Sequence, residues 1–223
     1  MNKASRVMTL LCYFAIVLIL SSPYSFAQSS KEDLTSQPIT IRLTKATLIY
    51  ALGILSVDHR IPIGLESSSD DRKNLLLNID TSNGGTLSDV LNSIVEQMPI
   101  YRWEVRDGVI NIVPNQSRDQ FLEKLLSTHI NRFTPKTGIT IFDIRNTLAD
   151  LPEVHSLLEE NKITLFKYGD YVYYPSIYTK EVDLSISDTD VRGVLNKVVR
   201  DSEHKLWVVG WRDEKKDSLT ISF

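Results

Sequence analysis

The segment LLLNIDTSNGGTLSDVLNSIVEQMPIYRWEVRDGVINIV, from Leu75 to Val113, decides the fold class. Near its start the apolar residues Leu75, Leu77 and Ile79 recur at every second position, which is typical of a half-buried strand. Gly84-Gly85 ends that strand, and Thr86–Asp89 has the capping-box pattern that begins a helix. Asp107-Gly108 is typical of a tight hairpin turn, between a strand with one apolar face formed by Tyr101, Trp103 and Val105 and a second strand over Val109–Val113. The segment therefore predicts strand, helix, strand, strand.

The residues before this segment predict three more elements. Alternation from Ile39 to Leu43 indicates a strand, and apolar spacing of three and four predicts an amphipathic helix from Thr47 to about Asp58. Ile61–Leu65 is expected to be a short strand, and Pro62 suggests that it lies at a sheet edge. The order becomes strand, helix, strand, strand, helix, strand, strand.

A second series of elements follows the first. We expect a connecting helix over Gln120–Ile130, a strand over Ile130–Phe133, and a helical segment over Ile139–Leu158 that Pro152 interrupts. The remaining expected elements are a hairpin from Ile163 to Tyr174, a strand over Val182–Ile186, a helix over Val191–Val199, and a hairpin formed by Leu206–Trp211 and Leu219–Phe223.

The two series resemble copies of one unit. Residues 90–103 align without gaps to residues 194–207, with five identities in 14 positions. The identities are Val90, Leu91, Asn92, Val95 and Trp103 with Val194, Leu195, Asn196, Val199 and Trp207. Internal similarity of this kind favours duplication. The alternative is that any two strand–helix–hairpin units share such patterns.

The composition is that of an ordinary folded protein. The chain has 223 residues, of which 42% are hydrophobic and 24% charged, and its formal net charge is -3. These values argue against a disordered acidic tail, a basic nucleic-acid-binding protein and a multi-span membrane protein. We therefore expect no nucleic-acid partner, and the order of strands and helices predicts an α+β protein with two small mixed-sheet domains.

The first 27 residues indicate export from the cytoplasm. A basic start precedes the apolar run Met8–Leu20, and Ser25 and Ala27 are the small residues that signal peptidase recognises, so we expect residues 1–27 to be removed. An uncleaved anchor is the alternative, but the run is shorter than the roughly 20 residues of a spanning helix. Removal of the segment also removes Cys12, the only cysteine, and leaves neither a disulfide nor a membrane span.

The run Ile39–Val113 is similar to the short N-terminal (STN) domain of secretins and TonB-dependent receptors. The likeness lies in the opening strand, the helix Leu48–Leu52, the helix start Gly85–Leu91 and the final hairpin. It departs at Asp58-His59-Arg60, where that family usually carries a glycine, and no receptor barrel or secretin pore follows. The resemblance implies small mixed sheets with two helices on one face, a periplasmic location, a protein-docking role and no catalytic residues.

These considerations give a domain plan. The plan is a signal peptide at 1–27, a flexible leader at 28–38, an STN-like domain at 39–116, a connecting helix at 117–130 and a second, diverged STN-like domain at 131–223.

Residues that could carry chemistry are sparse. The four histidines have no metal-ligand spacing, so we expect no metal site, and no motif predicts a cofactor. A carboxylate-dependent hydrolase that uses Asp143 or Glu153 is the least favoured alternative. We expect no catalytic residue.

Tyrosines are concentrated in one short segment, and this segment is the candidate binding site. Its members are Tyr168, Tyr171, Tyr173, Tyr174 and Tyr178. Tyrosine joins apolar area to a polar tip and is enriched at binding surfaces, although some of these rings could instead pack a sheet. The sequence thus predicts a non-catalytic periplasmic adaptor that binds an envelope protein such as an outer-membrane receptor or a secretion or pilus component. A small-ligand or glycan-binding module centred on the tyrosines is the alternative.

Overall fold

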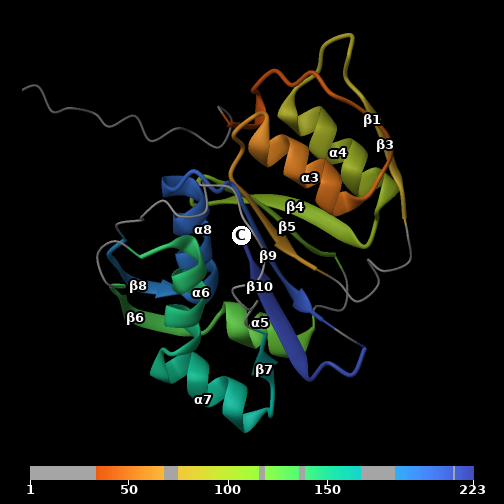
Figure 1. The fold of residues 1–223 in the computed structure, drawn as a ribbon. Helices are drawn as coiled ribbons and strands as arrows, with labels where there is room; N and C mark the ends of the chain where they lie inside the picture. Colours follow the sequence, from red (N-terminus) through yellow and green to blue (C-terminus); the bar gives the residue numbers. More distant parts are fainter. Residues whose placement is uncertain (1–33, 68–74, 116–118, 136–138, 167–183, 213) are drawn as a thin grey trace, which may run out of the picture. The chain divides into compact units, whose positions relative to one another are not determined.

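The computed structural model describes residues 34–67, 75–115, 119–135, 139–166, 184–212 and 214–223. Within them the protein is α+β, with six helices and mixed sheets (Figure 1). The helices are α3 (Leu48–Val57), α4 (Leu87–Gln97), α5 (Gln120–Leu126), α6 (Ile141–Ala149), α7 (Pro152–Glu160) and α8 (Val191–Asp201). The strands are β1 (Arg42–Ala46), β2 (Ile63–Glu66), β3 (Leu77–Asp80), β4 (Tyr101–Arg106), β5 (Val109–Pro114), β6 (His129–Phe133), β7 (Thr164–Leu165), β8 (Ile186–Asp190), β9 (Leu206–Trp211) and β10 (Ser218–Ser222).

Local signals place several of these elements where the sequence predicts them. The Thr86 hydroxyl accepts a hydrogen bond from the Asp89 N–H at 3.3 Å, and the Asp89 carboxylate accepts one from the Thr86 N–H at 2.8 Å, which completes the capping box of α4. Asp107 and Gly108 both have positive φ, 55° and 74°, as a type I′ turn between β4 and β5 requires. The hairpin of β9 and β10 is also confirmed.

One six-stranded sheet contains strands from both halves of the chain, in the order β4-β5-β2-β9-β10-β7. β2 lies inside this sheet and pairs in parallel with β5 on one side and β9 on the other. The expected edge position of this strand is therefore wrong. Pro62 precedes the strand, where its missing N–H interrupts no ladder bond, and its carbonyl still accepts a hydrogen bond from Ile110 N–H at 2.9 Å. The expectation of a separate small sheet in each half does not describe this arrangement.

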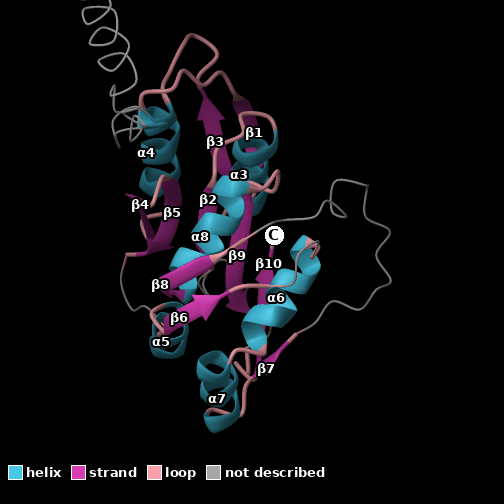
Figure 2. Ribbon diagram, turned by 90° about the vertical axis from the view of Figure 1, so that its left-hand side faces the viewer, coloured by secondary structure: helices cyan, strands magenta, loops and turns pink. Residues whose placement is uncertain are grey.

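Two short antiparallel sheets accompany the large one, β1 with β3 and β6 with β8. Helices lie between the sheets: α3 contacts β1 and β9, and α4 contacts β3 and β4. In the second half α8 contacts both short strands, β6 and β8, and also β2, β5 and β9 (Figure 2). In the first half two helices, α3 and α4, therefore lie on one side of the large sheet, with the short sheet β1–β3 packed against them.

The two halves bury opposite faces of the shared sheet. Along β9 the side chains alternate: Leu206 and Val208 pack with the core of the first half, while Trp207 and Val209 belong to the core of the second half. On β2, Ile63 and Leu65 likewise point toward the first core. The helices of the first half thus cover one face, and α8 covers the other.

A glycine allows β2 and β9 to pack closely. Gly64 pairs with Trp207, and a Cβ placed on Gly64 would lie 2.3 Å from the indole ring. Trp207 is completely buried, so its ring occupies the space that a side chain at position 64 would need. This contact explains how a large aromatic residue fits on a central strand.

Several boundaries differ from the sequence prediction. Strands β1 and β8 begin at Arg42 and Ile186, a few residues after the expected starts at Ile39 and Val182. The connecting helix α5 ends at Leu126, because β6 already begins at His129. The segment around Pro152 forms two helices, with Pro152 at the start of α7, where its missing N–H has no helical partner to lose.

Candidate docking surface on helix α3 and strand β1

Helix α3 is apolar on the side that faces solvent. Its ten residues, LIYALGILSV, contain no charged side chain. Leu48, Ala51, Leu52, Leu55 and Ser56 form its buried side. At 100° per residue the opposite side carries Ile49, Gly53 and Val57 in one line, with Tyr50 and Ile54 beside it. The exposed fraction of the residue is 49% at Ile49, 58% at Tyr50 and 70% at Val57.

This property distinguishes α3 from its neighbours in the described part of the chain. The exposed positions of α4 are Asp89, Asn92, Glu96 and Gln97. Those of the other described helices are also polar or charged where their burial is known, apart from Pro152 at the start of α7. A helix that is apolar on every side is normally buried. The only other large apolar residues that are strongly exposed within the described ranges, Leu75 and Leu76, precede β3. Since Leu77 pairs with Ala46, both lie near the start of α3. The exposed apolar residues are thus concentrated in one region, as at a protein-binding site.

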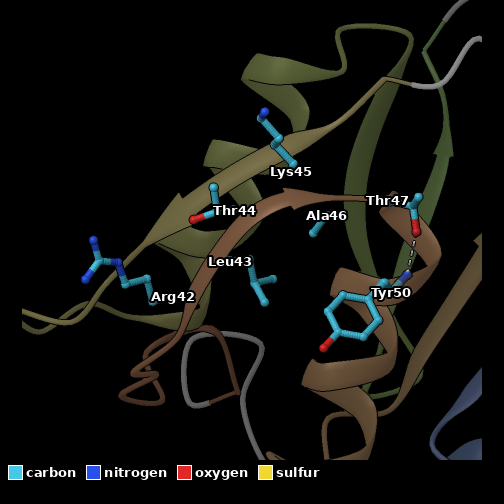
Figure 3. A pocket seen from close by; sticks show the side chains of 7 residues that line it. All are labelled: Arg42, Leu43, Thr44, Lys45, Ala46, Thr47 and Tyr50. Carbon is cyan, nitrogen blue, oxygen red and sulfur yellow. Dashed lines mark hydrogen bonds between the residues drawn. The ribbon is translucent and has the colours of Figure 1, made fainter.

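A hollow of about 470 Å³ lies between β1 and the start of α3. It is lined by residues 42–47 and Tyr50 (Figure 3). Leu43 and the Tyr50 ring lie on one side of the strand, whereas Arg42 and Lys45 extend away from the ring. Thr47 caps α3, and its hydroxyl accepts a hydrogen bond from the Tyr50 N–H at 3.3 Å. This bond fixes the turn that places Tyr50 beside the strand.

Strand β1 has one free edge among the described residues, since its short sheet contains only β3 besides it. The Thr81 N–H donates to the Ile41 carbonyl at 2.9 Å, so residue 41 faces β3. In an antiparallel ladder alternate residues bond to alternate sides. Leu43, paired with Ile79, therefore also faces β3, and the backbone groups of Arg42 and Thr44 point away from it.

The end of β1 is irregular. The ladder shifts register between Leu43 and Ala46, and Lys45 has a φ of 52°. The Lys45 N–H donates to the Asn78 side-chain oxygen at 3.0 Å, which fixes this left-handed residue. A bulge of this kind bends a strand and ends regular pairing. The regular free edge is consequently short.

The charge around this edge is mixed but leaves a cation exposed. Arg42 lies 3.5 Å from Asp80, and both side chains are largely exposed, at 76% and 53%. Hydrogen bonds from the Ser82 hydroxyl and backbone N–H hold the pKa of Asp80 below its ordinary value, so this carboxylate is ionised at neutral pH. Lys45 is exposed and lies beside the hollow. Such weakly paired, solvated cations remain accessible to a partner carboxylate.

The side chains that line the hollow offer apolar contact at Leu43 and Tyr50 and positive charge at Arg42 and Lys45. In the part of the chain that the structure describes, no group of three or more His, Cys, Asp or Glu side chains could hold a metal ion. Of the carboxylates considered for hydrolysis, Asp143 accepts hydrogen bonds from the Thr140 N–H at 3.2 Å and hydroxyl at 2.7 Å. It thus caps α6. Glu153 lies in the first turn of α7, where its negative charge interacts favourably with the helix dipole and stabilises the helix.

The predicted tyrosine site lies outside the described residues. This holds for Tyr168, Tyr171, Tyr173, Tyr174 and Tyr178, and also for the signal peptide at residues 1–27. Within the described ranges no helix is long and apolar enough to cross a membrane.

Sequence reasoning found the buried stripe of α3 but missed its exposed side. The signal was present, because Leu48–Val57 lacks any charged residue, and a helix with one solvated face normally carries some. The hollow beside β1 had no sequence signal, since it depends on the bulge at Lys45.

Comparison with known proteins gives no relative: no family model, no curated protein and no solved structure matches this chain.

Proposed function

We propose that this chain is a non-catalytic, exported adaptor of the bacterial envelope that docks a partner protein on the exposed side of α3. The observation that carries this proposal is the uniformly apolar solvent face of that helix, with Ile49, Tyr50 and Val57 about half or more exposed. An apolar face that the described part of the fold does not cover costs solubility, and it is typical of a surface that a partner covers. Export is inferred from residues 1–27, which resemble a signal peptide, and it places the protein in the periplasm.

We also infer that the two halves are diverged copies of one STN-like unit. Each half contains an antiparallel short pair, β1–β3 or β6–β8. Each has a hairpin, β4–β5 or β9–β10, whose second strand pairs in parallel with β2 or β7.

The aligned Asn and Trp residues support this inference. The Trp103 indole N–H donates to the Asn92 side-chain oxygen at 3.0 Å, and the Trp207 N–H donates to Asn196 in the same way at 2.9 Å. Both bonds join the helix to the first strand of the following hairpin. A shared hydrophobic pattern alone does not require this polar pair.

Partner capture from cross-linked envelopes tests the docking proposal. The bait is the tagged chain from Gln28 onward, compared with Ile49→Glu, Val57→Glu and the control Ser156→Glu, which adds the same charge to an exposed position of α7. We expect a specific envelope protein with the wild type and the control, and loss of that protein with both α3 variants. Equal recovery with all four baits would refute docking on α3. Amino-terminal sequencing of the periplasmic protein checks cleavage before Gln28.

A further inference from the structure

We propose that the free edge of β1 accepts an extended, acidic segment of the partner as a third strand, next to the apolar face of α3. This inference rests on the proposed docking function and adds the chemistry of the partner. It commits to a protein segment in extended conformation with at least one carboxylate. Three observations carry it: the free backbone groups, the hollow and the charge.

The backbone provides the first observation. Arg42 and Thr44 direct their N–H and carbonyl groups away from β3, and both residues are exposed. An exposed strand edge can pair with an added strand through these main-chain groups. The bulge before Ala46 ends the regular edge, so the added segment pairs over about three residues. A segment this short needs further contacts for its affinity.

The hollow supplies such a contact. It lies along the same residues, 42–47, and the Tyr50 ring forms part of its wall (Figure 3). Its volume of about 470 Å³ falls within the range of about 300–1,000 Å³ found for ligand pockets. Alternate side chains of an added strand point to one face. One of them, aromatic or aliphatic, enters the hollow against Leu43 and Tyr50.

The charges beside β1 indicate which charge the added segment should carry. Arg42 and Lys45 project from the strand and are exposed to solvent. Asp80, 3.5 Å from Arg42, is the counter-charge on the neighbouring strand, and no carboxylate lines the hollow. The surface therefore favours a carboxylate near each end of the added segment, although the whole chain has a net charge of -3.

A displayed library of random nine-residue peptides tests the proposal. Selection on the chain from Gln28 onward should enrich peptides rich in Asp and Glu with apolar residues at alternate positions. Synthetic copies of the selected peptides are then titrated against Thr44→Pro and the matched control Thr44→Ala. Proline removes the outward N–H, so we expect at least a tenfold loss of affinity for Thr44→Pro, whereas Thr44→Ala should bind as the wild type does.

Two further measurements keep the test independent of folding and of the α3 face. In an added strand every second amide faces β1, so N-methylation of one alternate set of amides should abolish binding, whereas N-methylation of the other set should not. The double charge reversal Arg42→Glu, Lys45→Glu should select basic peptides. Peptides that bind Thr44→Pro normally, or that lose binding only with Val57→Glu, would overturn strand addition and leave docking on α3 intact. Failure to enrich any peptide above background would overturn it as well.

Discussion

Replacing the two aligned asparagines one at a time should give very different losses of stability, although both hold a tryptophan in the same way. Asn196 is completely buried, and its side-chain oxygen accepts the 2.9 Å hydrogen bond of the equally buried Trp207 indole. Alanine at this position leaves a donor without a partner in the core, and such a group costs about 1–3 kcal/mol. The amide of Asn196 also lies 3.5 Å from the Arg106 carbonyl, which is at the limit of a hydrogen bond and adds little. We therefore expect Asn196→Ala to lower the free energy of unfolding by about 2 kcal/mol.

Asn92 is the matched control. It is exposed, and Trp103 is half-buried on β4 at the edge of the sheet. Water can replace the lost acceptor, so Asn92→Ala should cost no more than about 0.5 kcal/mol.

Urea unfolding followed by tryptophan fluorescence measures both values, with the slope m checked for a change in the unfolded state. Equal losses for the two variants would show that burial does not set the value of this bond. A loss below about 0.5 kcal/mol for Asn196→Ala would refute the argument that its oxygen satisfies the buried indole.

Two further substitutions test the charged contacts inside the fold. Asp119 caps α5, and its carboxylate lies 2.6 Å from the Lys216 ammonium. Burial raises the pKa of Asp119. Hydrogen bonds from Lys216, the Leu122 N–H and the Trp211 indole outweigh this effect and hold the pKa below its ordinary value. Asp119→Asn keeps the cap and removes the charge, so it should cost about 0.2–1 kcal/mol at pH 7, and the difference from wild type should shrink as pH falls below about 4, where the unfolded carboxyl takes up its proton. A pH-independent difference in urea unfolding would contradict this assignment. Arg192 forms an ion pair with Glu66 at 2.6 Å, and both side chains are almost fully buried. Arg192→Met leaves the Glu66 charge without this partner and should lower the stability by about 3–5 kcal/mol, whereas the double variant with Glu66→Leu should lose much less. Equal losses in thermal unfolding would exclude an uncompensated buried charge as the cause.

The elements that could be predicted from the sequence are those whose signals are local. The capping box at Thr86 and Asp89 begins a helix through bonds within four residues, and Asp107-Gly108 turns a hairpin through its own backbone angles. The same holds for α8, whose apolar stripe has helical spacing from Val191 to Val199. In each case the residues that carry the pattern also make the contacts.

The misplaced strand β2 shows where this reasoning fails. Pro62 favours an edge position when only its own neighbourhood is considered. The parallel partner on the far side, β9, begins more than 140 positions later in the chain, and the two strands fit because Gly64 leaves room for Trp207. No local pattern predicts a pairing that depends on the absence of a side chain at one position and a ring at another.

The two aligned tryptophans differ in burial because burial, like the pairing of β2, depends on elements that are far apart in the sequence. Trp103 belongs to β4, which ends the sheet, whereas β9 lies between β2 and β10. Because the second half packs α8 against the opposite face, Trp207 enters a core that Trp103 does not reach. An alignment of the two halves shows the shared Asn–Trp spacing but cannot show this difference in depth.

The exposed side of α3 is best understood through what the fold does not require of it. The buried side, including Leu52 and Leu55, already attaches the helix to its core, and polar residues at the exposed positions would leave these contacts intact. Apart from Pro152, the other described helices have polar residues where they are known to face solvent, so the general composition of the chain does not account for Ile49 and Val57. Stability and binding should consequently separate at this helix: substitutions on its outer side should change partner capture while the unfolding midpoint stays constant. A core role would move both quantities together.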